Sequence, residues 1–204
     1  MFALVESGTI TQFPKGNKGI TLGENQYPSS IYTLWTEAER NAIGIYTVEI
    51  DSTNRKDEEF YVNTNITYAF GSGKVTGSYG TATAKKLADE DAVDQSGNKI
   101  KDADGNQVIN YGLKTKYKNQ FNAQAAGLLA KTDWYVIKAA DVGSYSVPSN
   151  IATYRAAVRT KVNAMETSID GCSDVAALIT LLTYTTDSEG VTSRPLGEFP
   201  DEVV

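Results

Sequence analysis

Hydrophobic and polar residues alternate along the first half of the chain with the two-residue period of β-strands. Residues 2–13 alternate around Ser7-Gly8, a dipeptide typical of tight turns, and so predict a hairpin. Residues 45–50 combine β-branched and aromatic side chains and predict a further strand. We therefore expect the first half of the chain to be rich in antiparallel strands.

A second hairpin is expected where residues 65–70 and 74–83 flank the Gly-Ser-Gly sequence at 71–73. Gly77 and Gly80 interrupt its second strand. A glycine inside a strand indicates a bulge or a close approach of another chain segment.

One short helix is predicted between these hairpins, after a loop rich in Gly, Pro and Asn over residues 14–30. Thr36 and Glu39 stand three residues apart, the spacing of a capping box, and Gly44 lies where a glycine would end the helix. Trp35 precedes the cap, where a large apolar residue can pack on the first turn.

The second half changes to the helical period. One helix is predicted over residues 112–131, a second with Ser149 as N-cap that ends at residues 170–171, and a third from Ser173. Their apolar stripes consist of Leu113, Tyr117, Phe121, Ala125 and Leu128; Ile151, Tyr154, Val158, Val162, Met165 and Ile169; and Val175, Leu178, Ile179 and Leu182.

These patterns predict an α+β protein: an antiparallel β-rich half followed by a helical hairpin or small three-helix bundle. We expect a β-rich domain with one short helix over residues 1–110, a helical domain over 111–184 and an irregular tail over 185–204. The tail contains Pro195 and Pro200 and is expected to dock on another chain or on the helical half.

Residues 94–100 are echoed by residues 102–108, and each copy has turn chemistry followed by an apolar residue. The second copy superficially resembles a calcium loop. Its glycine, Gly105, comes too early, however, and Leu113 stands where the bidentate Glu of an EF-hand would be. A hairpin turn is therefore preferred over a metal site.

The composition argues against several kinds of catalytic and metal-binding site. The 204 residues include no His and a single Cys, Cys172, so neither a His-based mechanism nor a Cys/His zinc site is expected. The formal charge of −6 argues against nucleic acid as a partner. We expect no catalytic residues, no metal and no cofactor. A glycosidase that uses two of the acidic residues in runs 57–59 and 89–91 remains a residual alternative.

Two further patterns argue against a phosphate-binding loop and against a membrane-spanning segment. Residues 71–74 (Gly-Ser-Gly-Lys) superficially suggest a phosphate loop, but Tyr68 and Val75 replace the required glycine and hydroxyl residue. No apolar run is long enough for a membrane span, and the first residues lack the pattern of a signal peptide. We therefore expect no membrane partner and synthesis in the cytosol.

Short motifs resemble a bacteriophage family, the tail-fibre assembly or tail assembly chaperone-like proteins. In the helical half they are residues 130–137 (Ala-Lys-Thr-Asp-Trp-Tyr-Val-Ile), 154–159 (Tyr-Arg-Ala-Ala-Val-Arg) and 199–200 (Phe-Pro). Residues 2–14 and the helix–glycine–strand order of residues 36–50 are similar to the opening of such phage proteins. Residues 51–110 match no pattern of the family.

The resemblance implies a non-enzymatic, tail-associated structural protein that forms part of the tail or attaches tail fibres through protein–protein contacts. Its partners would be other phage tail proteins, in a homo-oligomer or ring, and it would lie in the virion tail after assembly in the host cytoplasm. Two alternatives stay open: an assembly chaperone absent from the mature particle, and a carbohydrate-binding module built on the aromatic-rich β half.

Five residues are candidates for partner contacts. Trp134 would cover the open end of the helical core, and Arg155 and Arg159, one turn apart, could pair with Asp133, with Asp141 or with a partner's carboxylates. The alternative is that these residues only hold the helical hairpin together. The candidates are Trp134, Tyr154, Arg155, Arg159 and Phe199.

Overall fold

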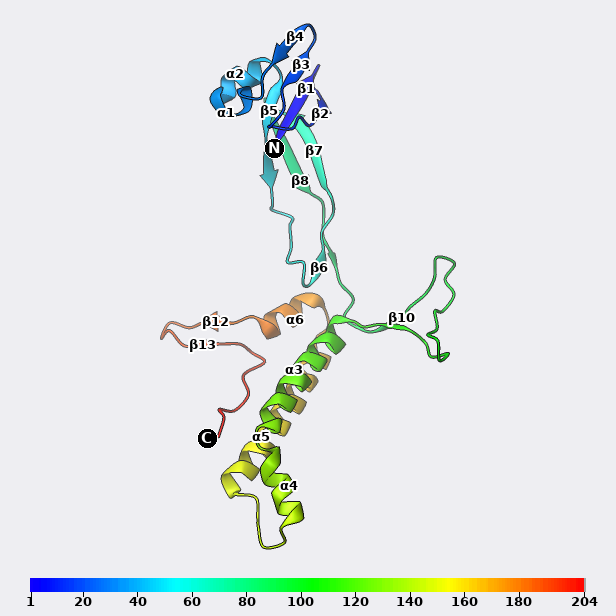
Figure 1. Cartoon of the computed structure of the whole chain (residues 1–204), viewed down its shortest axis with the longest axis vertical. Helices are drawn as coiled ribbons and strands as arrows, with labels where there is room; N and C mark the ends of the chain where they lie inside the picture. Colours follow the sequence, from blue (N-terminus) through cyan, green and yellow to red (C-terminus); the bar gives the residue numbers. More distant parts are fainter. Residues whose placement is uncertain (204) are drawn as a thin grey trace. The chain divides into compact units, whose positions relative to one another are not determined.

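The computed structural model describes residues 1–203 and confirms the predicted α+β class (Figure 1). The chain folds as two compact units, Met1–Thr83 and the remainder from Ala84 onward. Strands dominate the first unit and helices the second. Within the described residues, no helix is both long and apolar enough to cross a membrane.

A five-stranded sheet forms the body of the first unit. Its strand order is β2-β1-β5-β8-β7, and all neighbours are antiparallel except β5 and β8, which run parallel. The strands are β1 (Phe2–Glu6), β2 (Thr9–Gln12), β5 (Ile45–Asp51), β7 (Ile66–Gly71) and β8 (Lys74–Tyr79).

Both predicted hairpins are confirmed. Ser7 and Gly8 connect β1 to β2, Ser72 and Gly73 connect β7 to β8, and all four residues have positive φ angles between 50° and 78°. Two consecutive left-handed residues match the twist of antiparallel strands, which is why these dipeptides turn the chain here.

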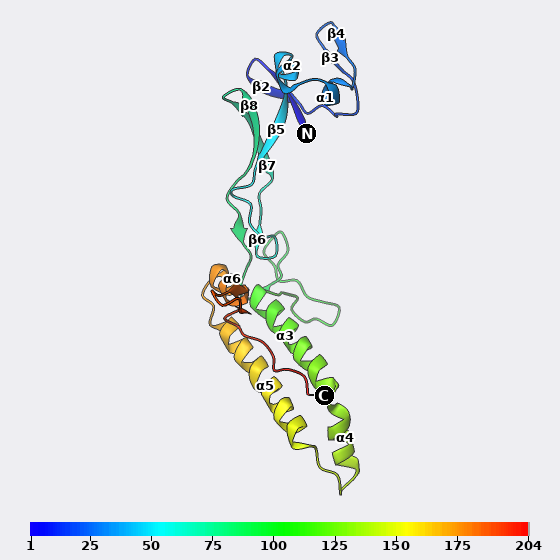
Figure 2. The ribbon, with the colours of Figure 1, turned by 90° about the vertical axis from the view of Figure 1, so that its left-hand side faces the viewer.

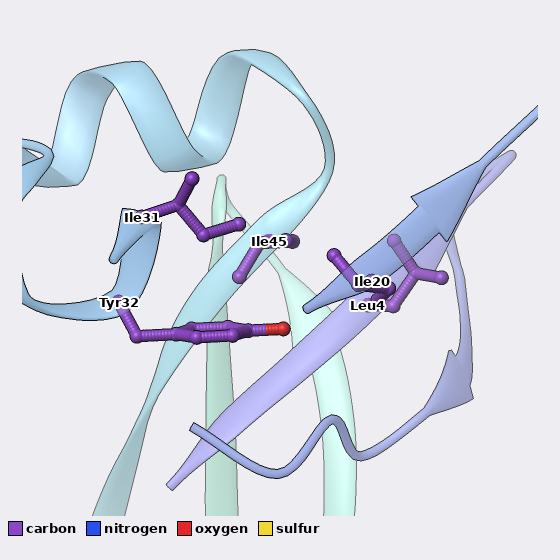
Figure 3. Close-up of a cluster of buried hydrophobic side chains, with 5 residues drawn as sticks. All are labelled: Leu4, Ile20, Ile31, Tyr32 and Ile45. Atoms are coloured by element: carbon purple, nitrogen blue, oxygen red, sulfur yellow. The ribbon is translucent and has the colours of Figure 1, made fainter. Parts of the chain in front are cut away.

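The sheet has a hydrophobic cluster on each face. Ala3, Val5, Val48 and Val75 pack on the inner face, where the sheet curls so that β2 approaches β7. The other face carries the cluster of Figure 3, in which Ile31 and Tyr32 point toward Ile45; its members are Leu4, Ile20, Ile31, Tyr32 and Ile45. The alternation predicted over residues 2–13 does not hold in β1, whose residues 2–5 form a continuous apolar run because the strand is covered on both faces.

Short elements cover the second of these faces. The predicted capped helix is α2 (Glu37–Ala42): Glu39 N donates to Thr36 Oγ1 at 3.3 Å, and Thr36 N donates to the Glu39 carboxylate at 2.8 Å. Gly44 follows with φ of +81°, and a Cβ there would lie 2.7 Å from the Val5 carbonyl oxygen. The glycine is therefore required for both conformation and space.

The loop predicted over residues 14–30 is more structured than expected. It contains the hairpin of β3 (Ile20–Leu22) and β4 (Asn25–Tyr27), and the one-turn helix α1 (Ile31–Leu34) follows directly. These elements are too short for a sequence period to indicate, and contacts with Leu4 and Ile45 stabilise them. The two-residue strands β6 (Tyr61–Val62) and β9 (Thr83–Ala84) complete this part of the chain.

Helices α3 (Leu113–Ala130) and α5 (Ser149–Asp170) form the core of the second unit and lie side by side (Figure 2). Apart from Arg155, the residues buried on them fall on the predicted stripes. Helix α6 (Val175–Leu182) packs on α5 through buried Val175 and Leu178. Its N-cap is Asp174, whose carboxylate accepts a hydrogen bond from Ala177 N at 2.8 Å.

Two details of the predicted helices are wrong. A fourth helix, α4 (Asp133–Asp141), begins almost directly after α3, so Trp134 lies in its first turn and not beyond a helix end. Ser149 is the first residue of α5, and the N-cap is Pro148. The ring of Pro148 holds its φ at −53°, and no side chain caps the first turn of α5.

Residues 84–110 belong to the second unit, although the sequence patterns assign them to the β-rich half. The reason lies at the start of α3, whose first N–H groups have no partner within the helix. Leu113 N donates to the Lys86 carbonyl, Lys114 N to the Leu87 carbonyl, and Gly112 N to the Asp89 carboxylate, at 2.8–3.0 Å. This segment therefore caps α3.

The predicted repeat builds a three-way junction of hairpins. Ala92 N donates to the Val108 carbonyl, Val108 N to the Ile100 carbonyl, and Ile100 N to the Ala92 carbonyl, at 2.8–3.0 Å. One arm is the stem of β10 (Glu90–Asp91) and β11 (Ile109–Asn110), and the other two are the repeat copies, which turn at residues 94–98 and 102–106. The eight-residue repeat thus places equivalent residues around one centre.

The C-terminal segment, predicted to be irregular, contains a small hairpin of β12 (Thr185–Thr186) and β13 (Thr192–Ser193). Its turn has the same chemistry as the two repeat copies: Glu189 N and Val191 N donate to Asp187 Oδ1, and Gly190 has a φ of +82°. After the hairpin, the segment packs on the helices.

Candidate interaction site

Arg155 is the best-connected candidate residue. It is only 7% exposed, and its guanidinium donates to the Leu129 carbonyl at 2.8 Å and to Thr132 Oγ1 at 2.7 Å. A third contact is an ion pair with the Asp133 carboxylate at 2.8 Å. One side chain of α5 therefore joins the end of α3 to the start of α4, and the expected pairing with Asp133 is present.

Tyr154 and Arg159 have different environments. Tyr154 lies in the helical core, and its hydroxyl group is buried with no hydrogen-bond partner among the described residues. Arg159 is exposed, and it makes a 3.5 Å hydrogen bond to the Arg155 carbonyl. Tyr154 is thus part of the core, whereas the guanidinium of Arg159 faces solvent.

Trp134 does not cover the end of the helical core, contrary to expectation. Its side chain is 56% exposed, because α4 turns the first-turn tryptophan outward. The ammonium group of Lys138 lies 4.9 Å from the centre of the Trp134 ring and 4.3 Å from that of Tyr145. Cation–π contacts of this kind hold the indole in place without covering its outer face.

Helix α4 has an exposed apolar face. None of its nine residues is buried within the part of the chain that the structure describes. Ile137 is 60% exposed and follows Trp134 by three residues, which places the two side chains on neighbouring positions of the helix surface. Trp134 and Ile137 are here called the α4 face. Val136 and Val142 are also exposed, at 41% and 43%, but Val136 stands two residues from Trp134 and so projects from another side of the helix.

The C-terminal segment docks on the helical half, one of the two placements expected for it. Leu196 is 3% exposed, its N–H donates to the Leu181 carbonyl, and its own carbonyl accepts from Lys161 Nζ at 2.8 Å. The guanidinium of Arg194 lies over the rings of Phe121 and Tyr184, at 5.2 and 4.8 Å. Phe199, the fifth candidate, is half-buried in this segment.

Sequence reasoning missed Arg194 and Leu196 as anchors. The signal was weak: a single Arg-Pro-Leu-Gly sequence between Ser193 and Glu198, with no period to mark a buried position. Contacts of an extended segment depend on the surface beneath it and not on its own pattern.

The acidic runs hold the local structure together. Asp89 accepts from Gly112 N and from Thr115 Oγ1, while Glu90 and Asp91 form ion pairs with Lys86 and Lys99. Asp57 accepts from Glu59 N at 2.8 Å. No group of three or more His, Cys, Asp or Glu side chains in the described residues could hold a metal ion.

Cys172 lies beside an open hollow of about 420 Å³ between the end of α5 and α6. Burial raises the pKa of its thiol, which lowers the population of the nucleophilic thiolate. The residue therefore behaves as a small apolar side chain at this helix junction.

No family model, curated protein or solved structure matches this chain.

Proposed function

We propose that the protein is a non-enzymatic, bacteriophage tail-associated structural protein that forms part of the tail or attaches tail fibres through protein–protein contacts. Two things support the proposal: the short motifs around Thr132-Asp133-Trp134 and Tyr154-Arg155, which resemble tail-fibre assembly proteins, and the α4 face. The α4 face is the observation that carries it.

A helix of nine residues is too short to be stable by itself, since isolated helices below about 12–15 residues are marginal in water. Helix α4 also gains little from packing, because none of its residues is buried in the described chain. Burial of a large apolar side chain contributes about 1.5–3 kcal/mol. A partner that covers Trp134 and Ile137 would supply the stabilisation that the helix lacks.

The partners in this proposal are other tail proteins, with further copies of the chain in a homo-oligomer or ring. An assembly chaperone would use the same α4 face and leave before the particle is complete. Mass spectrometry of purified particles separates the two roles: we expect the chain in mature particles, and its absence would favour the chaperone.

The α4 face is tested by Ile137→Glu in the full chain. A carboxylate at this exposed position should leave the fold intact but prevent apolar contact with a partner, because the charge would have to lose its water. We expect the variant to disappear from purified particles and from complexes with tail proteins.

The matched control is Val191→Glu, the same kind of change at another exposed apolar residue of the second unit. It should be incorporated normally. If both variants are incorporated as well as the parent chain, the α4 face is not the assembly surface.

A further inference from the structure

A hollow of about 320 Å³ opens in the first unit where β2 ends and the chain turns back over residues 13–19. Its volume lies within the range of small-molecule sites, about 300–1,000 Å³. The side chains that matter here are Gln12, Phe13, Lys15 and Lys18, all of which line the hollow. We call this feature the β2-end hollow.

Phe13 gives the hollow an aromatic wall. Its ring is 42% exposed and lies against the ring of Tyr68, with centroids 4.7 Å apart and planes tilted by 56°. Tyr68 stands on β7, the opposite edge of the curled sheet. The contact fixes the ring of Phe13 while much of its surface stays open to a ligand.

Two cationic groups line the same hollow in a chain whose net charge is −6. Elsewhere in the first unit, Lys74 pairs with Glu49 at 2.9 Å and Arg55 with Glu58 at 3.0 Å. Neither Lys15 nor Lys18 has an ion pair within the described residues. Their charges are therefore available to an anion.

We propose that the β2-end hollow binds a carboxylated sugar. The C–H face of a pyranose ring would lie on Phe13, the carboxylate between Lys15 and Lys18, and a hydroxyl group would bond to the amide of Gln12. One aromatic wall, two ammonium groups and one amide match the three kinds of group that an acidic sugar presents. This inference is independent of the tail role.

Trigalacturonate is the probe that tests the site, and its fully methyl-esterified form is the matched neutral ligand. Both have the same sugar rings, and only the first carries carboxylates. We expect trigalacturonate to shift the NMR signals of Phe13, Tyr68, Lys15 and Lys18 in the full chain. The ester should bind about tenfold more weakly, because it keeps the ring contact and loses the charge-assisted bonds.

Two variants separate charge from ring contact. Lys15→Gln with Lys18→Gln should lower the affinity for trigalacturonate about tenfold and leave the ester unaffected. Phe13→Leu should weaken both ligands. The control, Lys56→Gln with Lys74→Gln, makes the same change of charge at lysines outside the hollow and should bind like the parent chain.

Three outcomes would overturn the proposal. They are no shift with trigalacturonate at millimolar concentration, equal loss of binding in the control variant, and equal binding of hexaglutamate, which would show attraction of any polyanion. Amide spectra of each variant establish that it is folded. Because the assay uses the isolated chain, its result is separate from the particle experiments.

Discussion

Individual residues of the second unit contribute very differently to its stability, depending on their contacts. Arg155 and Arg159 are the same residue type one helical turn apart. Arg155 is nearly buried and its guanidinium contacts three acceptors, whereas Arg159 is exposed to solvent. Removal of Arg155 would leave the Leu129 carbonyl and the Thr132 hydroxyl without their charged donor.

This difference predicts unequal stability costs. Arg155→Ala should lower the free energy of unfolding of the second unit by about 3 kcal/mol, since it removes the charge-assisted hydrogen bonds and the packing of a nearly buried side chain. The loss of stability in Arg155→Lys should be smaller than in Arg155→Ala but larger than zero, because an ammonium group keeps the charge and cannot match the planar fork of the guanidinium. Arg159→Ala should change it by no more than about 0.5 kcal/mol. Denaturant unfolding measures all three, and equal costs for the two alanine variants would contradict the assignment.

Among the elements, the hairpin turns of the junction depend on single carboxylates. Asp94 Oδ1 accepts from Ser96 N and Asn98 N, and Asp102 Oδ1 accepts from Asp104 N and Asn106 N, at 2.8–3.0 Å. Backbone N–H groups favour the ionised form, and they lower the pKa of Asp94 and of Asp102 from the ordinary 3.8.

A lowered pKa in the folded state means that the turn is stabilised above the pKa of the unfolded chain. The stabilisation is lost as the pH falls through the folded value. We therefore expect the amide NMR signals of Asn98 and Asn106 to stay constant down to about pH 4 and to shift only in stronger acid. Asp102→Asn should abolish the acid shift at Asn106 and leave the shift at Asn98. A midpoint above pH 4 at either turn would contradict this account.

The whole molecule has two units with separate cores, and this arrangement predicts that the two units unfold separately. Ile45 is fully buried in the first unit and Leu196 is 3% exposed in the second. Each truncation to alanine should cost about 2–5 kcal/mol. Because the cores are separate, we expect two unfolding transitions, with Ile45→Ala lowering one and Leu196→Ala lowering the other.

Calorimetry of the full chain, with hydrogen exchange to assign each transition, provides the measurement. The C-terminal segment should exchange together with α3 and α5 in this experiment, since Leu196 accepts a hydrogen bond from Lys161 of α5 and Arg194 lies over Phe121 of α3. A single transition that both variants lower equally would show that the units unfold as one.

The sequence by itself determined the features that local chemistry specifies. Ser7-Gly8 and residues 71–73 turn the chain because few residues accept left-handed angles, and Thr36 with Glu39 starts a helix because the two side chains cap each other. The apolar stripes of α3 and α5 follow from the helical period alone, and they placed Tyr154 on the core side. Burial of Arg155 did not follow from this pattern.

Only the tertiary structure decided which segments meet. The parallel pairing of β5 with β8, the capping of α3 by residues 86–89 and the docking of Leu196 all join residues whose own sequences carry no sign of their partner. The start of helix α4 also depends on a distant segment, because Arg155 of α5 contacts Thr132 and Asp133 there. Each of these segments packs where another element leaves hydrogen-bonding groups or apolar surface uncovered. The position of that surface depends on the three-dimensional arrangement and not on the sequence of the segment itself.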